Sequence, residues 1–395
     1  MELLHQQTKA IDKLHRLKVG ALFMEPGTGK TRTAYELVKS VKSDYILWLT
    51  PFQTKQNLLD EINKCGGLDV LEIVGIETLS SSDKTYLDLH NKVNSRKTFL
   101  IVDESLKIKN WEANRTKRIL ELSKFCEYKL ALNGTPITRN LLDVWAQFEF
   151  LSPKILNMGI AEFKNTFCEW VKITKRHNGK TMIKEFISKY HNVDYLYSLI
   201  KHYVYECDLE LTIEQQHQDI TYTLGKEEKQ RYSELKEKYL DNERLAFLNN
   251  NIFLEMTMKM QHEYCCTEDK FIQLDKILKE HELNKIIVYT KYIVSREALQ
   301  KRYPDLQVLS YQKHSLGLNL QKYNTTIYWD KTFDYAQMTQ SEFRTYRTGQ
   351  IDNCKYYSMT GDVGLEKMIN DNIKKKQSLL DYFKKVGSEQ IKKEL

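Results

Sequence analysis

Short apolar runs alternate with longer amphipathic stretches between residues 19 and 153, and this alternation restricts the fold more than any other feature. The runs have the length of strands and occupy residues 19–24, 45–50, 71–74, 98–102 and 129–133. Strands that are apolar along their whole length are buried on both faces, as in parallel sheets covered by helices. Amphipathic stretches between the runs supply such helices. The sequence therefore predicts an α/β unit with a parallel sheet.

The rest of the chain falls into three segments. Residues 154–268 are mainly helical in pattern, with one short strand expected at 218–224. Residues 269–362 return to alternating strands and helices, and residues 363–395 are helical with basic clusters. We therefore expect an α/β protein with two parallel-sheet lobes, residues 1–153 and 269–362, a helical insertion between them and a basic C-terminal helical tail. The tail is either a solvated helix face or a nucleic-acid contact, and both interpretations stay open.

Charge and composition exclude some classes of protein. The net charge of +7 is compatible with a polyanionic partner but is not diagnostic. The apolar runs are far shorter than the ~18 residues of a membrane helix, and the N-terminus lacks a secretory pattern. Seven cysteines without a C-x-x-C pair favour free thiols in a reducing cytoplasm over a zinc site at Cys265 and Cys266. We expect a cytoplasmic location and no membrane partner.

The segment after the first apolar run has the pattern of a phosphate-binding loop. It reads MEPGTGKT over residues 24–31, between an expected strand and an expected helix. Two glycines let backbone amides surround a phosphate, Lys30 can reach the β- and γ-phosphates, and the Thr31 hydroxyl can bind Mg²⁺. Met24 stands where the strict pattern has its first glycine, and the strand–loop–helix setting compensates for this departure. The residues expected to hold the nucleotide are Gly27, Thr28, Gly29, Lys30 and Thr31.

Two later motifs carry charged groups suited to phosphoryl transfer. The run at residues 98–102 ends in Asp103 and Glu104, where Asp103 can hold Mg²⁺ and Glu104 can polarise the attacking water. Arg344 and Arg347 lie three positions apart, and we expect them to project from one helical face toward a triphosphate across a cleft. Each motif is weak evidence alone, because adjacent carboxylates often cap a helix and an Arg-x-x-Arg helix is usually solvated.

Taken in order, the motifs resemble the ATPase core of superfamily-two helicases, and within it the Swi/Snf-like DNA translocases. In the first lobe, HQQTKAI resembles the glutamine motif, MEPGTGKT motif I, LTPFQTKQN motif Ia, DESLKIKN motif II and LNGTPITRN motif III. In the second lobe, KIIVYTKY resembles motif IV, HSLGLNL motif V and FRTYRTGQ motif VI. The terminal Gly-Gln of motif VI, together with LNGTPI, indicates this branch, and the resemblance covers nearly the whole chain.

The resemblance implies two RecA-like lobes that sandwich ATP and Mg²⁺ and bind DNA. It makes Gln7 the reader of adenine, Arg347 an arginine finger and Arg344 its neighbour on the phosphates. The residues that it implies in loops coupling nucleotide to DNA are Thr135, Gly317 and Asn319, and Gly317 is also expected near the nucleotide.

Three departures from the family pattern bear on function. Leu106 replaces the histidine of the D-E-x-H motif, and Phe343 replaces the acid before the first arginine of motif VI. Residues 286–311 hold only one strand–helix–strand unit, since such a unit takes about 30 residues. The second lobe is therefore expected to be trimmed, which puts some of its DNA contacts in doubt.

The resulting expectation is a DNA-dependent ATPase that moves on, or remodels, duplex or branched DNA through sequence-independent phosphate contacts. A strand-separating helicase is the first alternative, and an ATP-gated clamp without productive turnover is the second. The stretch at residues 320–340 leaves no room for a strand-separating hairpin. The compact chain, rich in Lys, Asn and Ile, suggests a bacterial or bacteriophage protein from an AT-rich genome, in a bacterial or host cytoplasm.

Overall fold

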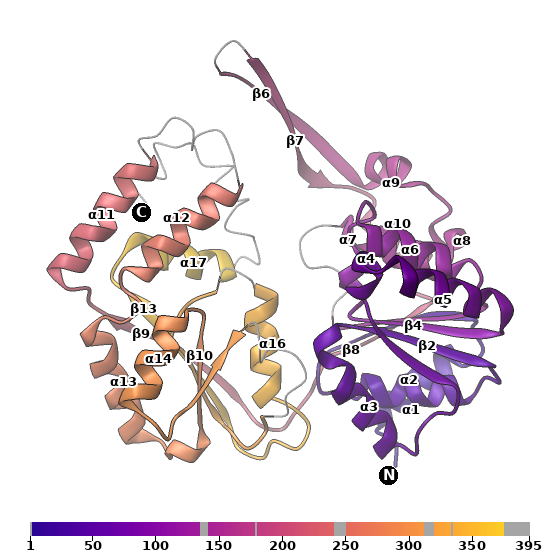
Figure 1. The fold of residues 1–395 in the computed structure, drawn as a ribbon, viewed down its shortest axis with the longest axis horizontal. Coiled ribbons are helices and arrows are strands. Elements are labelled where there is room, and N and C mark those ends of the chain that lie inside the picture. The colour runs from indigo at the N-terminus through magenta and orange to yellow at the C-terminus, as the bar shows by residue number, and fades with distance from the viewer. Residues whose placement is uncertain are drawn as a thin grey trace. The chain divides into compact units, whose positions relative to one another are not determined.

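The computed structural model describes residues 2–134, 141–177, 180–240, 250–311, 320–332 and 335–374. The chain divides into two compact units, Met1–Leu209 and Glu210–Leu395. Each unit is built on its own parallel sheet with helices on both faces (Figure 1). The predicted α/β fold class with two parallel-sheet lobes is confirmed. In the part of the chain that the structure describes, no helix is long and apolar enough to cross a membrane.

The first unit contains a six-stranded sheet with the order β3-β2-β4-β5-β1-β8. All neighbours in it are parallel, and every strand predicted between residues 19 and 133 is present. Its strands are β1 (Val19–Met24), β2 (Tyr45–Thr50), β3 (Leu71–Gly75), β4 (Thr98–Asp103), β5 (Tyr128–Asn133) and β8 (Val204–Cys207). Its helices are α1 (His5–Leu14), α2 (Lys30–Lys39), α3 (Lys55–Lys64), α4 (Thr78–Ser81), α5 (Asp83–Ser95), α6 (Asn114–Ser123), α7 (Asp143–Leu151), α8 (Pro153–Leu156), α9 (Ile160–Phe167) and α10 (Val193–Ile200), with short 3₁₀ helices η1 (Phe52–Thr54) and η2 (Ser105–Ile108).

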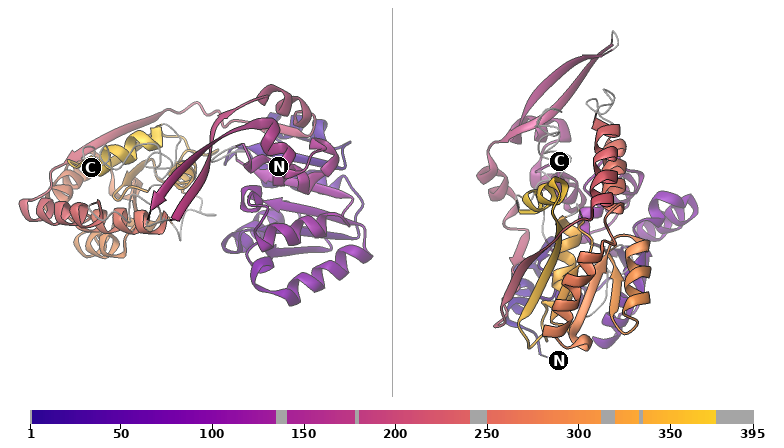
Figure 2. Two further views of the ribbon diagram at one scale, coloured as in Figure 1. Left: turned by 90° about the horizontal axis from the view of Figure 1, so that it is seen from above. Right: turned by 90° about the vertical axis from the view of Figure 1, so that its left-hand side faces the viewer.

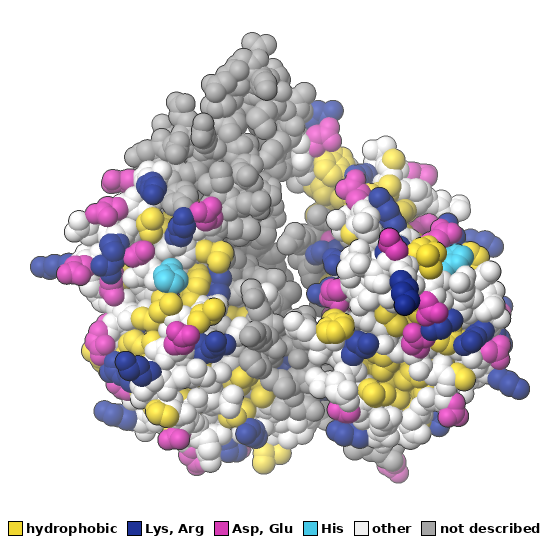
Figure 3. Space-filling view, in the orientation of Figure 1, with side chains coloured by type: hydrophobic (Ala, Val, Ile, Leu, Met, Phe, Trp, Pro, Cys, Tyr) yellow, Lys and Arg dark blue, Asp and Glu magenta, His cyan; other side chains and the backbone are white. Residues whose placement is uncertain are grey.

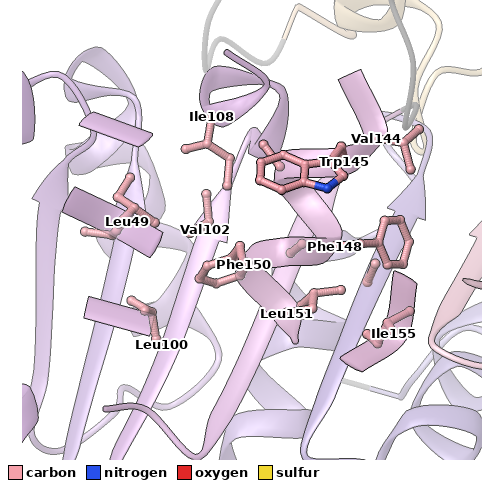
Figure 4. Packing of buried hydrophobic residues seen from close by; sticks show 14 of the residues in the cluster. Leu49, Leu100, Val102, Ile108, Val144, Trp145, Phe148, Phe150, Leu151 and Ile155 are labelled. Carbon is pink, nitrogen blue, oxygen red and sulfur yellow. The ribbon is translucent and has the colours of Figure 1, made fainter. Parts of the chain in front are cut away.

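Two cores hold this sheet, one on each face. Along β2, Leu47 and Leu49 belong to one core, whereas Ile46 and Trp48 belong to the other. Helix α7 contributes aromatic side chains to the first core. Phe150 lies beside Val102 of β4 (Figure 4), and Phe148 contacts Phe23 of β1 edge to face. Burial on both faces explains why these strands are apolar without alternation.

The region expected to be a helical insertion is organised differently. Its first part belongs to the first unit and contains the antiparallel strands β6 (Cys168–His177) and β7 (Lys180–Tyr190), while β8 joins the sheet beside β1. Its second part contains β9 (Gln215–Tyr222), which joins the sheet of the second unit beside β13 and overlaps the strand expected at 218–224. β9 is an edge strand and mostly exposed, so it lacks the apolar run by which buried strands are recognised. The division of the chain after Leu209 thus runs through the middle of this region.

The second unit contains a five-stranded parallel sheet with the order β11-β10-β12-β13-β9. Its other strands are β10 (Ile286–Thr290), β11 (Gln307–Ser310), β12 (Thr325–Tyr328) and β13 (Cys354–Gly361). Its helices are α11 (Lys226–Leu240), α12 (Asn250–His262), α13 (Glu268–Glu280), α14 (Ile293–Arg302), α16 (Tyr335–Thr345) and α17 (Gly364–Lys374), with the 3₁₀ helix η4 (Leu283–Lys285). The predicted basic tail begins with α17, and residues 375–395 lie outside the described residues.

A buried carboxylate fixes the ends of two strands in the second unit. Asp330, just after β12, accepts hydrogen bonds from the backbone amides of Lys291 (2.9 Å) and Tyr292 (3.2 Å), which follow β10. Lys270 of α13 approaches the same carboxylate at 3.4 Å, and both side chains are buried. Buried charges are stable only when they are paired and hydrogen-bonded, and this group meets that condition. It holds the strand ends where motif IV lies.

Candidate nucleotide site

The phosphate-binding loop connects β1 to α2 at the carboxyl end of the sheet. Gly27 and Gly29 have φ values of 94° and 89°, in the left-handed region that favours glycine. Thr28 is fully buried, and its hydroxyl donates to the Glu25 carbonyl at 2.7 Å. Lys30 is the first residue of α2, so the amides of the first helical turn face the loop. A helix N-terminus with such a loop is a binding site for anions.

Strand β8 supports the loop from the side. The amide of Glu25 donates to the Cys207 carbonyl at 2.9 Å, and the Glu25 carboxylate accepts from the amide of Leu209 at 2.9 Å. Sequence reasoning missed this support, because Glu25 and Leu209 are 184 positions apart. The loop conformation therefore depends on a segment that closes the first unit.

Gln7 lies directly against the loop. Its side-chain carbonyl accepts from the amide of Leu4 at 2.8 Å, and its amide nitrogen donates to the Gly29 carbonyl at 3.3 Å. A Cβ at Gly29 would stand 2.0 Å from that nitrogen, so a side chain at position 29 would displace the Gln7 side chain. These contacts show that Gln7 positions the loop. The assignment of Gln7 as the reader of adenine stays a prediction.

We expect Gly29→Ala to lower nucleotide affinity by more than tenfold, because it adds a clash with Gln7 to an unfavourable φ. Gly159→Ala is the matched control, since nothing lies within 4 Å of a Cβ there and the backbone is extended. The measurement is equilibrium titration with a fluorescent ATP analogue, alongside circular dichroism. Equal affinity in both variants would show that the contact between Gln7 and Gly29 does not shape the site.

Asp103 and Glu104 end β4 beside the loop. The Asp103 carboxylate accepts from the Glu104 amide at 3.0 Å and from the Thr50 hydroxyl at 3.3 Å. Burial and the neighbouring Glu104 charge raise the pKa of Asp103 to about 7, while the Lys30 charge acts in the opposite direction. Glu104 itself has a φ of 52°, a strained conformation for a residue with a side chain. Strain of this kind is concentrated at functional sites.

The donor set fits Mg²⁺. Asp103 supplies a carboxylate and Thr31, in the first turn of α2, supplies a hydroxyl, and Mg²⁺ prefers such oxygen ligands. Burial, together with the adjacent Glu104 carboxylate, raises the pKa of Asp103, and a bound divalent cation would favour its ionised form. Lys30 donates to the Met24 carbonyl at 2.5 Å, so its ammonium lies at the base of the loop.

A buried hydrogen-bond chain joins this turn to α7. Ser105 donates to the Gln147 side-chain carbonyl at 2.6 Å, and the Gln147 amide nitrogen donates to the Asp143 carbonyl at 2.8 Å. Both side chains are fully buried. Sequence reasoning missed this pair, although a lone Gln in the apolar stretch of α7 was an available signal. Leu106, which replaces the family's histidine, lies half-buried in η2.

We expect Ser105→Ala to lower the free energy of unfolding of the first unit by about 1–3 kcal/mol, because it removes the hydrogen bond that Ser105 donates to the buried Gln147 carbonyl. Ser105→Ala combined with Gln147→Leu should recover part of this loss, since both polar partners are then removed. The measurement is a double-mutant cycle by chemical denaturation. Strictly additive effects would contradict a direct coupling between the two side chains.

The second unit carries the predicted arginines. Arg344 lies in the last turn of α16, but the helix ends at Thr345, so Arg347 lies in the following turn. The expectation that both project from one helical face is therefore wrong. The Arg344 charge acts to lower the pKa of the buried Tyr289, whose pKa is raised above its ordinary value by burial. Both arginines are half-buried.

The terminal Gly-Gln of motif VI shapes that turn. Gly349 has a φ of 99°. Gln350 is buried, and its side-chain amide donates to the carbonyls of Gln321 (2.9 Å) and Tyr323 (2.8 Å). The Gln350 backbone amide also donates to the Arg347 carbonyl at 2.9 Å. These hydrogen bonds fix the turn that contains Arg347 to the segment before β12. The predicted residues Thr135, Gly317 and Asn319 lie outside the described residues.

Comparison with known protein families places the chain in one of them. The model of the SNF2-related domain matches residues 36–280, which is more than half of the chain. The chain belongs to the SNF2-related family. Membership of this family supports an ATP-hydrolysing enzyme, in line with the phosphate-binding loop and the paired carboxylates.

Individual relatives of this SNF2-related protein are distant. It is 24% identical over 342 residues to the ISWI chromatin-remodeling complex ATPase CHR11 of Arabidopsis thaliana, covering 71% of this chain and 30% of that protein. It is 26% identical over 167 residues to nucleoside triphosphatase I of Choristoneura biennis entomopoxvirus, covering 37% of this chain and 26% of that protein. The chain thus spans less than a third of these relatives. A solved structure, the Sulfolobus solfataricus SWI2/SNF2 ATPase core in complex with dsDNA, is 18% identical with a TM-score of 0.45, covering 100% of this chain and 95% of that one.

Proposed function

We propose that this protein is an ATP-dependent DNA translocase, which couples ATP hydrolysis to movement on, or remodelling of, duplex or branched DNA. The observation that carries the proposal is the assembly of the phosphate-binding loop, Lys30 and the Asp103–Glu104 turn at one sheet edge, in a chain of the SNF2-related family. The names of several relatives, chromatin-remodelling ATPases among them, point the same way.

Each residue has a distinct task in the proposed reaction. The loop amides and Lys30 would hold the β- and γ-phosphates, and Glu104 would orient the attacking water. Mg²⁺, held by Thr31 and Asp103, would neutralise charge on the phosphates. Arg347 of the second unit would stabilise the charge that develops in the transition state. Phosphoryl transfer needs positioning and charge more than covalent chemistry, so closing and opening of the units could be coupled to hydrolysis.

We further propose that DNA is bound mainly through its phosphates and without sequence preference. Composition favours a bacterial or bacteriophage origin and a cytoplasmic location. A strand-separating helicase and an ATP-gated clamp are the competing functions.

One set of assays separates these functions. ATP hydrolysis is measured without nucleic acid and then with duplex, single-stranded, forked and four-way DNA and with RNA. Displacement of a third strand from a duplex reports translocation, and displacement of one strand from a fork reports unwinding. We expect duplex or four-way DNA to stimulate hydrolysis and the third strand to be displaced. Efficient fork unwinding would favour the helicase, and nucleotide binding without turnover would favour the clamp. Glu104→Gln is the inactive control.

A further inference from the structure

A two-stranded ribbon projects from the first unit. Strands β6 and β7 pair antiparallel from Cys168 opposite Tyr190 at the base to His177 opposite Lys180 at the far end. Figures 1 and 2 show the ribbon extending beyond α9, away from the sheet of its own unit. β6 has ten residues, so the ribbon is ~33 Å long at about 3.3 Å per residue. No part of the proposed ATP site lies on it.

The base of the ribbon is fixed to the core of the unit. Cys168 is buried, and Trp170 and Ile187 pack against the same core as α7. The amide of His191 donates to the Phe167 carbonyl at 3.0 Å, so the chain leaving β7 is tied to the end of α9. The direction of the ribbon is therefore set by the folded unit.

Charge is distributed unequally along the ribbon. Its two acidic residues lie nearer the base, where Glu169 is 3.1 Å from His191 and Glu185 is 3.0 Å from Lys172. Residues 173–177 and 180–184, which we call the distal half, contain four Lys or Arg residues and no Asp or Glu. These cations are Lys175, Arg176, Lys180 and Lys184.

In the strand register, none of the residues directly opposite these four positions is acidic. Lys184 is opposite Ile173, Lys175 is opposite Met182, Arg176 is opposite Thr181, and Lys180 is opposite His177. Elsewhere, on the face of the described residues that Figure 3 shows, basic and acidic side chains are interspersed. The distal half thus concentrates positive charge without an acidic residue, and an isolated two-stranded ribbon is only marginally stable. A polyanion bound to the distal half would balance this charge.

We propose that the distal half of the β6–β7 ribbon binds duplex DNA through the phosphates that border one groove. The major groove, about 12 Å wide, admits a two-stranded ribbon. The distal half has five residues of β6, which span ~16 Å at about 3.3 Å per residue, close to half of a duplex turn of about 34 Å. Contacts to phosphates hold a protein on the duplex without reading its sequence, as a moving enzyme requires. This inference rests on the proposed function for the identity of the nucleic acid, and it adds a contact remote from the phosphate-binding loop.

The test compares two sets of four substitutions to glutamine. The ribbon variant carries Lys175→Gln, Arg176→Gln, Lys180→Gln and Lys184→Gln. The control variant changes four exposed lysines of the same unit at or just beyond the ends of α1, α2, α3 and α6, namely Lys13, Lys42, Lys64 and Lys124. These helix ends lie at the edge of the sheet opposite the phosphate-binding loop. Each variant loses four positive charges, so the two variants differ only in where those charges were located.

The readout is the salt dependence of duplex binding. The slope of log affinity against log salt should become shallower by about 0.9 for each lost phosphate contact, or up to about 3.6 for four. The control variant should keep the parental slope. Hydrolysis without DNA should be the same in all three proteins, because no substituted residue lies in the ATP site.

A shortened ribbon gives an independent second variant. Deleting residues 174–177 and 180–183 joins Ile173 to Lys184 through Asn178 and Gly179. Four residues leave each strand, and because this number is even, the alternation of pair types along the ribbon is kept. This variant loses three of the four cations, so the slope of log affinity against log salt should become shallower by about 2.7. Circular dichroism checks that the unit still folds.

The outcomes separate this inference from the proposed function. A parental slope in both ribbon variants, with DNA-stimulated hydrolysis in the parent, would overturn the ribbon contact and leave the translocase standing. A protein partner for the ribbon would give that same result. A slope that is shallower in the ribbon variants than in the parental protein would support the ribbon contact. If no DNA stimulated hydrolysis by that same parental protein, the translocase would be overturned.

Discussion

Arg347→Ala is expected to lower DNA-stimulated ATP hydrolysis by roughly 10³–10⁵-fold, the range that arginine fingers contribute in phosphoryl-transfer enzymes. ATP affinity should stay within a few-fold, because the phosphate-binding loop in the first unit makes most contacts to the bound nucleotide. Arg347→Lys should restore little, since an ammonium group lacks the planar fork of a guanidinium. Arg344→Ala should also reduce the rate, but by less. The measurements are the rate of hydrolysis with and without duplex DNA and nucleotide binding by equilibrium titration.

Arg302→Ala is the matched control for Arg347. Arg302 is an exposed arginine of the same unit, at the end of α14, and it pairs with Glu268 at 2.8 Å. A surface pair of this kind contributes at most about 1 kcal/mol to stability, so the DNA-stimulated rate should not change. If Arg347→Ala kept most of that rate, the finger would be misassigned, and coupling of hydrolysis to closure of the two units would lose its main support.

Lys30→Ala is expected to abolish ATP hydrolysis. The substitution removes the cation at the base of the phosphate-binding loop and also the positive charge that acts against protonation of Asp103. Glu104→Gln should abolish turnover while nucleotide binding persists, because the amide keeps the shape of the side chain but loses the anion that orients water. Both variants are assayed for phosphate release and for binding of a fluorescent ATP analogue.

Lys39→Ala, at the far end of α2, is the control for Lys30. It removes an exposed lysine from the same helix, so hydrolysis should stay at the parental rate. Turnover in Glu104→Gln near the parental rate would remove the assignment of Glu104. Turnover in Lys30→Ala would place phosphate binding elsewhere in the chain.

Local patterns predicted the strands that carry the candidate site of the first unit. The strands β1 and β4 are buried on both faces, so their apolar runs marked them, and the functional residues follow each run directly. The glycines of the loop were also predictable, because positive φ values at Gly27 and Gly29 favour residues without a side chain.

Prediction was poorer for residues 154–268, where the strands lie at the edge of a sheet or form a separate two-stranded ribbon. β9 lies at a sheet edge and is mostly exposed, and the β6–β7 ribbon pairs only with itself within its sheet. Neither segment has apolar residues at a clear period of two, so the sequence pattern favoured helices in this region. The position of Arg347 beyond α16 likewise depends on the contacts of Gln350 with residues that precede β12.

The sequence by itself determined the family, the two parallel sheets and the chemical groups offered to a nucleotide, because these depend on burial and on motifs a few residues long. Only the tertiary structure decided that β8 supports the phosphate-binding loop, that Gln7 packs against Gly29 of this loop and that Lys175, Arg176, Lys180 and Lys184 belong to a projecting ribbon. Each of these features joins segments that are distant in the chain or depends on strand pairing, and local periodicity carries no information about which segments meet.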